Sequence, residues 1–363
     1  MARLFVRSSG LARGALAALA AFVALPAFAQ MTLSTQPFAK AYTPIPFVSP
    51  ANFAASLLKN AREAQAIRDF CSTMRTYYKK YGWHDDPCGH VKWRADLRSK
   101  NGHPLIYAAF GRGTETTLIL GGVHANELTP MHLAFRAARY LDEHPGTLNS
   151  DVRAIIAPLV NPDGFLRTNP TRTNADGIDL NRNLFTLDWY DKAHRLWSGR
   201  RHRVLAHFPG YFPNSEVETI FQIRLIDRFH PDKILSIHAP LGFLDYDGPG
   251  AGQLPHPTRT EVKARRLVKA ISEKSKNYKV EDYTFYPGSL GNYAGNERHI
   301  PTVTLELETT QPKLVDAYWK QFWPGILESI HYQYKAPATL EALGNDNASP
   351  FSALYCPIPD KTI

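Results

Sequence analysis

Cysteine is scarce in this sequence: three occur in 363 residues, at Cys71, Cys88 and Cys356. None stands in a Cys-x-x-Cys pair or at a zinc-ribbon spacing with histidine, which argues against a structural zinc module. In an oxidising compartment Cys71 and Cys88 would close a short loop and leave Cys356 odd, but spacing alone does not fix the pairing. We therefore expect structural thiols or one disulfide.

The first thirty residues contain no acidic residue. They carry three arginines, then an apolar run from Ala15, and close on the small-residue pattern "AFA" at Ala29. This layout predicts a secretory signal peptide over residues 1–29, with an uncleaved anchor as the alternative, and the lack of an Arg-Arg pair argues against a twin-arginine signal. The run is short for a membrane span, and no later segment approaches that length. We expect a periplasmic or secreted bacterial protein with no stable membrane insertion.

The sequence carries a modest excess of positive charge. Lysine and arginine number 42 and aspartate and glutamate 33, a formal net charge of +9 that falls to +6 once the three leader arginines are removed. The basic residues are dispersed apart from Arg200, Arg201 and Arg203, and no nucleic-acid-binding motif occurs. The excess suits an acidic polymer such as a bacterial cell wall without requiring one.

After the leader we expect an extended lead-in and helix over 30–89, a catalytic domain over 90–335 and a surface tail over 336–363. Apolar residues recur at helical spacing from Phe53 to Tyr81, which predicts an amphipathic helix packed on the domain that follows. Asn101-Gly102 lies between two alternating stretches and predicts a β-hairpin.

Four apolar runs predict buried strands, namely "TTLILGG", "VRAIIAPLVN", "KILSIHA" and "PTVTLEL". Helical stretches separate them and begin near Leu128, Ser215 and Thr260, and Ser215 with Glu218 reads as a capping box. Apolar strands alternating with helices indicate the α/β class: a mixed, mainly parallel sheet with helices on both faces.

Polar side chains gather at the predicted strand ends. His124 and Glu127 follow one strand, His238 ends another and Glu306 lies near the end of a third. Ligands of open α/β sheets collect at the carboxyl ends of strands, and catalytic zinc takes three His or carboxylate ligands and leaves a position for water. His-x-x-Glu alone is a weak motif, and it is not HExxH, because no second histidine follows on the same helix.

The segment "NPDGFLRTNPTRTNADGIDLNRNLF", residues 161–185, combines turn signals with several arginines. Arginine beside asparagine suits a substrate carboxylate, since the guanidinium binds it bidentately and the amide adds a donor. Any one of these residues fits an ordinary Asx turn, but the whole string does not.

Together these motifs resemble the zinc carboxypeptidase family, the carboxypeptidase A-like peptidases. The family order is matched by His124-x-x-Glu127, then "NPDG" from Asn161, Arg172, "DLNRN" from Asp179, the distant His238, and "TLEL" from Thr304. The resemblance covers about residues 90–335 and implies the carboxypeptidase A-like fold, preceded here by the N-terminal helix.

The resemblance also implies roles for individual residues. His124, Glu127 and His238 would bind one Zn²⁺ ion, and Glu306 would be the general base for a zinc-bound water. Glu308 competes for that role, but the Thr304-x-Glu306-Leu307 frame favours Glu306.

Around this centre, Arg172 would stabilise the oxyanion and Asp179 would orient a zinc histidine. Asn181 and Arg182 would hold the terminal carboxylate of the substrate. The tyrosine that closes over the substrate would be Tyr283 or Tyr286, with Tyr283 fitting the ungapped frame better. Leu290 and its neighbours, which include no acid, would line the pocket of the departing residue.

Within the family, "YPGSLGNY" and "TRTNADGIDLNRN" look most like the murein peptide amidase and cell-shape carboxypeptidase branch. This likeness implies peptidoglycan stem peptides or muropeptides as substrates, cut between D-glutamate and meso-diaminopimelate. Asp245 and Asp247 are then candidates to hold the distal ammonium of diaminopimelate, although a solvated Asp-Gly turn would also explain them.

Three alternatives stay open. A general exported metallocarboxypeptidase that releases apolar C-terminal residues is compatible with Leu290. An aspartoacylase-like deacylase shares part of the motif set, but the "NPDG" string and the leader argue against it. A wall-binding protein without catalysis is the least favoured, because His124, Glu127, His238 and Glu306 are all present.

Overall fold

The computed structural model describes residues 50–249, 259–284 and 286–333. By its contacts the chain falls into two units, Met1–Ser49 and Pro50–Ile363, and every element below belongs to the second. The predicted signal peptide, most of the lead-in, Cys356 and the tail over 336–363 lie outside the described residues.

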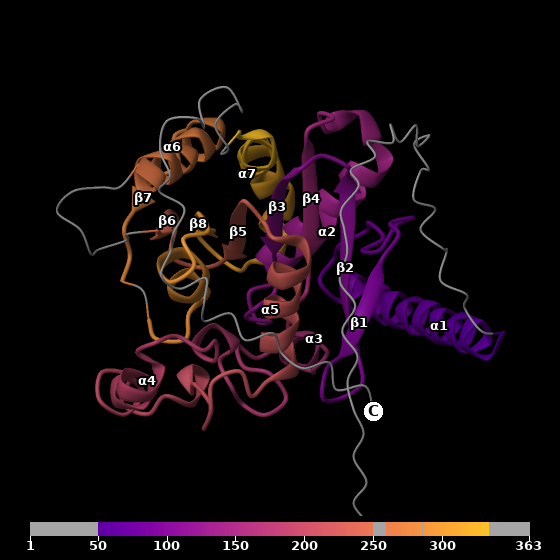
Figure 1. The fold of residues 1–363 in the computed structure, drawn as a ribbon, viewed down its shortest axis with the longest axis horizontal. Coiled ribbons are helices and arrows are strands. Elements are labelled where there is room, and N and C mark those ends of the chain that lie inside the picture. The colour runs from indigo at the N-terminus through magenta and orange to yellow at the C-terminus, as the bar shows by residue number, and fades with distance from the viewer. Residues whose placement is uncertain (1–49, 250–258, 285, 334–363) are drawn as a thin grey trace, which may run out of the picture. The chain divides into compact units, whose positions relative to one another are not determined.

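A sheet forms the centre of the fold (Figure 1). Within the described residues it has eight strands in the order β1-β2-β4-β3-β5-β8-β6-β7. Their bounds are β1 Arg94–Arg98, β2 Pro104–Gly111, β3 Glu115–Leu120, β4 Val152–Ala157, β5 Lys233–His238, β6 Phe243–Gly248, β7 Val280–Glu281 and β8 Thr302–Glu306. The four central strands β4, β3, β5 and β8 run parallel and are the four apolar runs of the sequence. The predicted mixed, mainly parallel sheet is confirmed.

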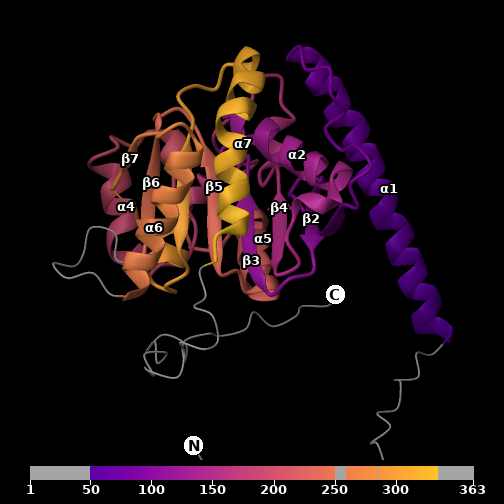
Figure 2. The ribbon, with the colours of Figure 1, turned by 90° about the horizontal axis from the view of Figure 1, so that it is seen from above.

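Helices cover both faces of the sheet. Figures 1 and 2 show α2, α6 and α7 on one face and α5 on the other. The α-helices are α1 Pro50–Lys80, α2 Leu128–Glu143, α3 Pro162–Phe165, α4 Trp189–Ser198, α5 Val217–Phe229, α6 Arg259–Lys274 and α7 Val315–His331. The short turns are the π-helical η4 Gly291–Asn296 and the 3-10 helical η1 Pro145–Thr147, η2 Leu180–Arg182, η3 Leu205–His207 and η5 Pro312–Leu314. Among these described helices none combines the length and apolar content needed to cross a bilayer.

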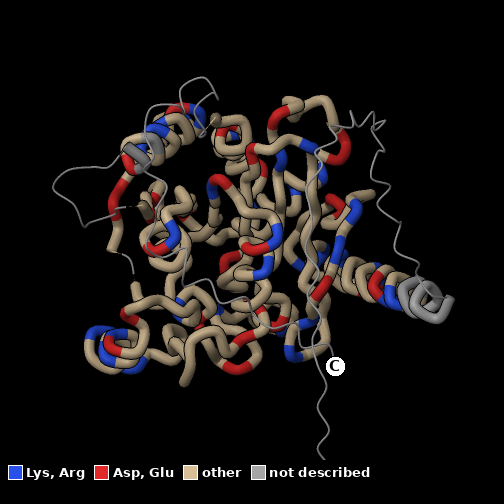
Figure 3. Tube along the Cα trace, in the orientation of Figure 1, with Lys and Arg blue, Asp and Glu red and all other residues tan. Residues whose placement is uncertain are grey.

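The core has two parts, one on each face of the sheet. The larger cluster packs α2, α6 and α7 against inward residues such as Ile119 and Leu235. The smaller cluster packs α5 against the opposite residues, among them Leu118 and Ile234. Adjacent strand residues face opposite sides, so a central strand buried on both faces must be apolar throughout, and this explains the continuous runs in the sequence. Lysine and arginine residues are interspersed with acidic residues along the described trace (Figure 3).

The predicted N-terminal helix is present as α1, and its second half packs closely on the domain. Phe70, Met74 and Tyr78 are buried there, whereas residues 58–62 are exposed. The predicted packing therefore holds for the part of α1 next to β1. Side chains before Leu58, including Phe53 and Leu57, lie outside the description.

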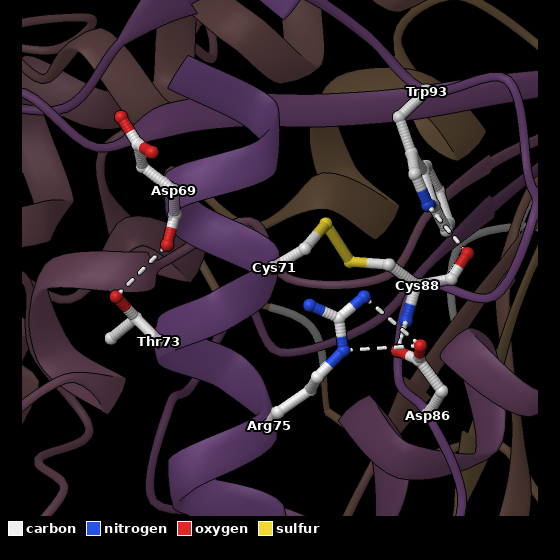
Figure 4. The surroundings of a disulfide bond; sticks show 7 residues. All are labelled: Asp69, Cys71, Thr73, Arg75, Asp86, Cys88 and Trp93. Atoms are coloured by element: carbon white, nitrogen blue, oxygen red, sulfur yellow. Dashed lines mark hydrogen bonds and ion pairs between the residues drawn. A yellow bond between two sulfur atoms is a disulfide. The ribbon is translucent and has the colours of Figure 1, made fainter. Parts of the chain in front are cut away.

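A disulfide ties α1 to the loop that follows it (Figure 4). Cys71 and Cys88 are bonded, with their Cα atoms 5.9 Å apart, so one of the two outcomes expected for the thiols is observed. The Arg75 side chain forms an ion pair with Asp86 at 3.0 Å beside it. Trp93 Nε1 donates to the carbonyl of Cys88 at 3.0 Å, which joins the loop to the start of β1.

The segment "FLDYDG" is a strand, not the loop that the sequence reading allowed. It forms β6, which pairs antiparallel with β8 and parallel with β7, and all six of its residues are buried. A solvated Asp-Gly turn at Asp245 and Asp247 is therefore wrong. Pairing with its neighbours supplies hydrogen bonds for the buried backbone and outweighs the low strand preference of aspartate.

The expected capping box before α5 is also wrong. The helix begins after Glu216, and no side chain caps it. The Ser215 hydroxyl donates to Glu216 at 2.6 Å instead, while Glu218 is fully buried and accepts a hydrogen bond from Asn174 Nδ2 at 3.1 Å. Ser215 Oγ also accepts from Asn183 Nδ2 at 3.0 Å, so side chains from distant segments bind both members of the motif.

The burial of Glu218 should make the stability of the fold depend on pH. Burial raises the pKa of Glu218 to about 7, so the folded state holds the proton more tightly than the unfolded chain does. The resulting stability is complete below about pH 4.5 and is lost as the pH rises through 7. Glu218→Gln keeps an acceptor for Asn174 but does not titrate. Between pH 4.5 and 8 the unfolding free energy of the wild type should therefore fall by about 3 kcal/mol more than that of this variant. Urea unfolding at pH 4.5 and 8 measures the difference, and parallel profiles would contradict it.

Candidate metal centre and active site

The turn between β3 and α2 carries the first part of the site. Gly122 has φ +58, a left-handed backbone conformation that favours glycine. A Cβ on Gly121 would lie 2.7 Å from Cβ of Ala134 and 2.8 Å from the carbonyl oxygen of Pro158. No side chain fits at this position, where the chain leaves the sheet. The expected sharp turn is present, and it delivers His124 and Glu127 just before α2.

The second part lies on two neighbouring strands. His238 is the last residue of β5 and Glu306 the last of β8, and the two are register partners in a parallel pair. Because the strands run parallel, both side chains reach the carboxyl edge of the sheet, beside the turn after β3.

His124, Glu127 and His238 converge in a buried space. His124 Nδ1 lies 2.8 Å from Glu127 Oε1 and 3.1 Å from His238 Nδ1, and His238 Nδ1 lies 3.0 Å from Glu127 Oε2. Zinc bonds of about 2.0 Å in a tetrahedron require ligand atoms about 3.3 Å apart, so the spacing fits the ion. The three side chains are 3–5% exposed, and this group is placed for metal binding.

Charge balance supports that placement. Burial alone would raise the pKa of Glu127, but His124 and His238 beside it outweigh burial and hold the pKa well below its usual range. The carboxylate is therefore ionised, and two ring nitrogens face it. Burial acts to lower the pKa of His238, but Glu127 raises it above its ordinary value. Zinc binding requires a deprotonated carboxylate and neutral imidazoles, so the ion would take the place of the proton that His238 shares with Glu127.

Asp179 lies behind the centre. Its Oδ1 is 3.0 Å from His124 Nε2, and its Oδ2 accepts from Arg172 Nε at 2.9 Å. Burial acts to raise the pKa of Asp179, but Arg172 and His124 hold it well below its usual range. With Nε2 bonded to Asp179, the Nδ1 atom of His124 is turned to the centre. This is the contact expected of a residue that orients a metal histidine.

Glu306 lies at the rim of the centre. Burial raises its pKa to about 7, and the backbone N–H of Leu241 donates to Oε2 at 3.4 Å. A carboxyl with a pKa near neutrality can accept and return a proton at little cost. Glu308, the competing residue, is exposed beyond the end of β8.

Asn181 and Arg182 lie on the η2 turn directly after Asp179. Asn181 Oδ1 accepts from the backbone N–H of Leu290 at 2.8 Å, and the Arg182 carbonyl accepts from Trp189 Nε1 at 2.8 Å. These bonds fix the turn and leave the Asn181 amide nitrogen available as a donor. The Leu290 side chain itself is 4% exposed and belongs to the smaller core cluster.

The two candidate tyrosines differ in their surroundings. The Tyr286 ring lies 4.2 Å from the guanidinium carbon of Arg182. The Tyr283 side chain is 40% exposed and its ring lies 5.5 Å from that of Phe243. Tyr286 thus contacts a predicted carboxylate-binding residue, and Tyr283, although more exposed, is joined to Tyr286 by a side-chain hydrogen bond.

Asp245 and Asp247 lie on the same face of β6 and are 7% and 9% exposed. Asp245 is the register partner of Thr304, two residues before Glu306, and Asp247 Oδ2 accepts from Thr304 Oγ1 at 2.5 Å. Register partners in an antiparallel pair point to one side of the sheet, so both aspartates share the face of Glu306. Burial raises the pKa of Asp245 to about 6, and burial together with Asp245 raises that of Asp247 to about 8.

Sequence reasoning missed two residues near this site. His207 Nδ1 lies 3.5 Å from Asp179 Oδ2, and the guanidinium carbon of Arg201 lies 4.7 Å from the Tyr286 ring. Both belong to the segment after α4, which has no motif of its own. The run of three arginines at 200–203 was the one available signal, and it did not distinguish Arg201 from its neighbours.

Comparison with known proteins agrees with this geometry. The model of the zinc carboxypeptidase family, Peptidase_M14, matches residues 98–325. The chain belongs to this family, whose cofactor is zinc. The group of His124, Glu127 and His238 is placed to bind such an ion. The residues before 98, with α1 and the disulfide, lie outside the match.

Its curated relatives include murein peptide amidases. The Escherichia coli K12 protein of that name is 34% identical over 152 residues, which span 41% of this chain and 59% of the relative. The Vibrio campbellii protein is 28% identical over 243 residues, 61% of this chain and 83% of the relative. Among solved structures, bovine thrombin-activatable fibrinolysis inhibitor aligns with a TM-score of 0.57 at 16% identity, over 74% of this chain and 95% of its own, which shows the fold.

The contact between Asp179 and His124 predicts an effect on metal affinity. Asp179→Asn keeps the side-chain shape but removes the charge that orients His124, so zinc should bind about 10- to 100-fold more weakly. Competition with a chromophoric chelator measures the dissociation constant. Asp191→Asn, an exposed position in the first turn of α4, is the matched control. Equal affinities in the two variants would show that Asp179 does not support the metal ligand.

Proposed function

We propose that the chain is an exported zinc-dependent carboxypeptidase or amidase that hydrolyses peptidoglycan stem peptides. The proposed scissile bond joins D-glutamate to meso-diaminopimelate. The names of the Escherichia coli and Vibrio relatives support the substrate class. Family membership and the buried His/Glu/His group support the chemistry.

The observation that carries the substrate proposal is the pair Asp245 and Asp247 on the face of Glu306. Diaminopimelate bears an ammonium at its far end in addition to its carboxylates. Burial raises the pKa of both carboxyls, and an ammonium beside them would lower that pKa and gain an ion pair. We therefore propose that these aspartates receive the distal ammonium.

The chemistry follows from the positions of the side chains. Zinc held by His124, Glu127 and His238 supplies a Lewis acid that activates water and polarises the scissile carbonyl. Glu306 takes the proton of the attacking water on its carboxylate and returns it to the leaving amine, which its pKa of about 7 allows.

Arginines bind the charges of the substrate. Arg172 NH1 lies 3.6 Å from Glu127 Oε1, so its guanidinium is close enough to the centre to stabilise the oxyanion. Asn181 and Arg182 hold the terminal carboxylate through an amide and a guanidinium donor, which restricts hydrolysis to a chain end. Tyr283 or Tyr286 closes over the bound residue.

Export is part of the proposal. The leader-like residues 1–29 support it, and so does the Cys71–Cys88 disulfide, because disulfides persist in oxidising compartments such as the periplasm.

The rival proposal is a peptidase that releases apolar C-terminal residues. It depended on Leu290 as a pocket residue, and the side chain of Leu290 packs in the smaller core cluster.

The test is cleavage of defined peptides by the zinc-loaded protein, read by mass spectrometry. We expect release of diaminopimelate from L-Ala-γ-D-Glu-meso-diaminopimelate, and its loss on chelation. Glu306→Gln should lower kcat at least about 100-fold, because the proton acceptor is gone.

Glu308→Gln is the matched control, since this glutamate lies two residues on and is exposed. It should retain wild-type turnover. Equal losses in both variants would contradict the role of Glu306. Cleavage of a blocked apolar dipeptide but not of the tripeptide would overturn the murein assignment and leave the peptidase chemistry standing.

A further inference from the structure

Two guanidinium groups contact the Tyr286 ring. The guanidinium carbon of Arg182 is 4.2 Å from the ring centroid and that of Arg201 is 4.7 Å away, so the two carbons lie within about 9 Å of each other. Arg201 belongs to the turn after α4, whose backbone is fixed by Arg201 N–H donating to the Leu196 carbonyl at 3.0 Å. Its side chain is thus brought to the carboxylate-binding residues from a separate segment.

This group of arginines carries uncompensated positive charge. Within residues 50–249, 259–284 and 286–333, neither Arg182 nor Arg201 forms an ion pair with a carboxylate. Asp179, the nearest acid to Arg182, is bonded to His124 and Arg172. Burial lowers the pKa of Arg182 to about 10, Asp179 partly opposes this, and Arg172 and Arg201 lower it further. Three guanidinium groups, those of Arg172, Arg182 and Arg201, thus act on one another here, and Asp179, the acid beside them, is paired with Arg172.

Position decides which part of a substrate would reach Arg201. In the proposed function the scissile bond lies at the metal centre and Arg182 holds the terminal carboxylate. Arg201 and Arg182 contact the same ring, so a group beside Arg201 belongs to the departing residue. Trp197, His207 and Pro287 line the same crevice as these three residues. Arg201 is partly exposed and can therefore meet a ligand.

We infer that Arg201 binds a second carboxylate of the departing residue, so that the site selects C-terminal amino acids with an acid at the far end of the side chain. The inference rests on the proposed function in one respect, the binding of the terminal carboxylate by Arg182. Diaminopimelate fits, because its two carboxylates stand at opposite ends of one short carbon chain. Asp245 and Asp247 take its ammonium, and Arg201 takes its remaining acid.

The alternative is that Arg201 merely stacks on Tyr286 and holds the ring in place. A positioning role would affect every substrate, because the ring would shift for all of them. Binding of a second carboxylate affects only substrates that possess one. Two tripeptides separate these cases: L-Ala-γ-D-Glu-meso-diaminopimelate, and the same peptide ending in L-lysine, which has the distal ammonium but lacks the distal carboxylate.

The experiment measures kcat/KM of the zinc-loaded full chain on both tripeptides. The wild type should prefer the diaminopimelate peptide, and Arg201→Gln should lower this preference about 10- to 100-fold, mainly through KM. Arg201→Lys should restore part of the preference because it keeps the charge. Arg200→Gln, an exposed neighbour, is the matched control and should keep the wild-type ratio.

Equal losses on both tripeptides in Arg201→Gln would overturn the inference in favour of stacking, and so would a wild type without preference. If the wild type cleaves neither tripeptide, the murein assignment fails separately. The arginine is then tested on acyl-glycyl dipeptides ending in 2-aminopimelate or in 2-aminoheptanoate, which differ by the distal carboxylate. A preference for 2-aminopimelate that Arg201→Gln abolishes supports the inference, and its absence in the wild type overturns it.

Discussion

The arrangement of His124, Glu127 and His238 is the constraint on which the rest of the site depends. Two ring nitrogens and a carboxylate lie about 3 Å apart in a space that water barely reaches. Such a group is costly to bury without a cation, because the carboxylate stays ionised and the lone pairs of the rings face one another. The parallel strands β3 and β5 bring His124 and Glu127 together with His238, which lies more than a hundred residues further along the chain. Asp179 and Arg172 behind them hold His124 in the ligating orientation.

Much of this arrangement could be predicted from the sequence, and the reason is physical. The central strands must be apolar on both faces, which makes them visible as continuous runs, and the motif residues stand directly at their ends. Knowledge that the carboxyl ends of parallel strands meet at one edge then suffices to bring His124, His238 and Glu306 together. The glycines before His124 were likewise readable, since only a residue without a side chain fits there.

What the sequence did not indicate depends on tertiary partners. β6 looked like a turn because Asp245, Asp247 and Gly248 disfavour strands, and only pairing with β8 and β7 overrides that preference. Ser215 and Glu218 had the pattern of a helix cap, but both are taken by side chains from distant segments. Arg201 and His207 lie in a segment without periodicity or motif, so no local signal marked them. Specificity determinants on such loops are the part of a site that local sequence describes least.

The extension before the family domain packs against one side of it. The second half of α1 and the Cys71–Cys88 disulfide lie beside β1 and β2. The end of α1 and the loop after it also contact the segments that follow β4 and β8, through Tyr77 with Phe165 and Trp83 with Pro312. The central claim remains the metal centre, and zinc X-ray absorption on the purified protein tests it most directly. The account predicts nitrogen and oxygen ligands at about 2.0–2.1 Å, with two histidines whose number falls to one in His238→Ala. Sulfur at about 2.3 Å, or an unchanged histidine count in that variant, would contradict it.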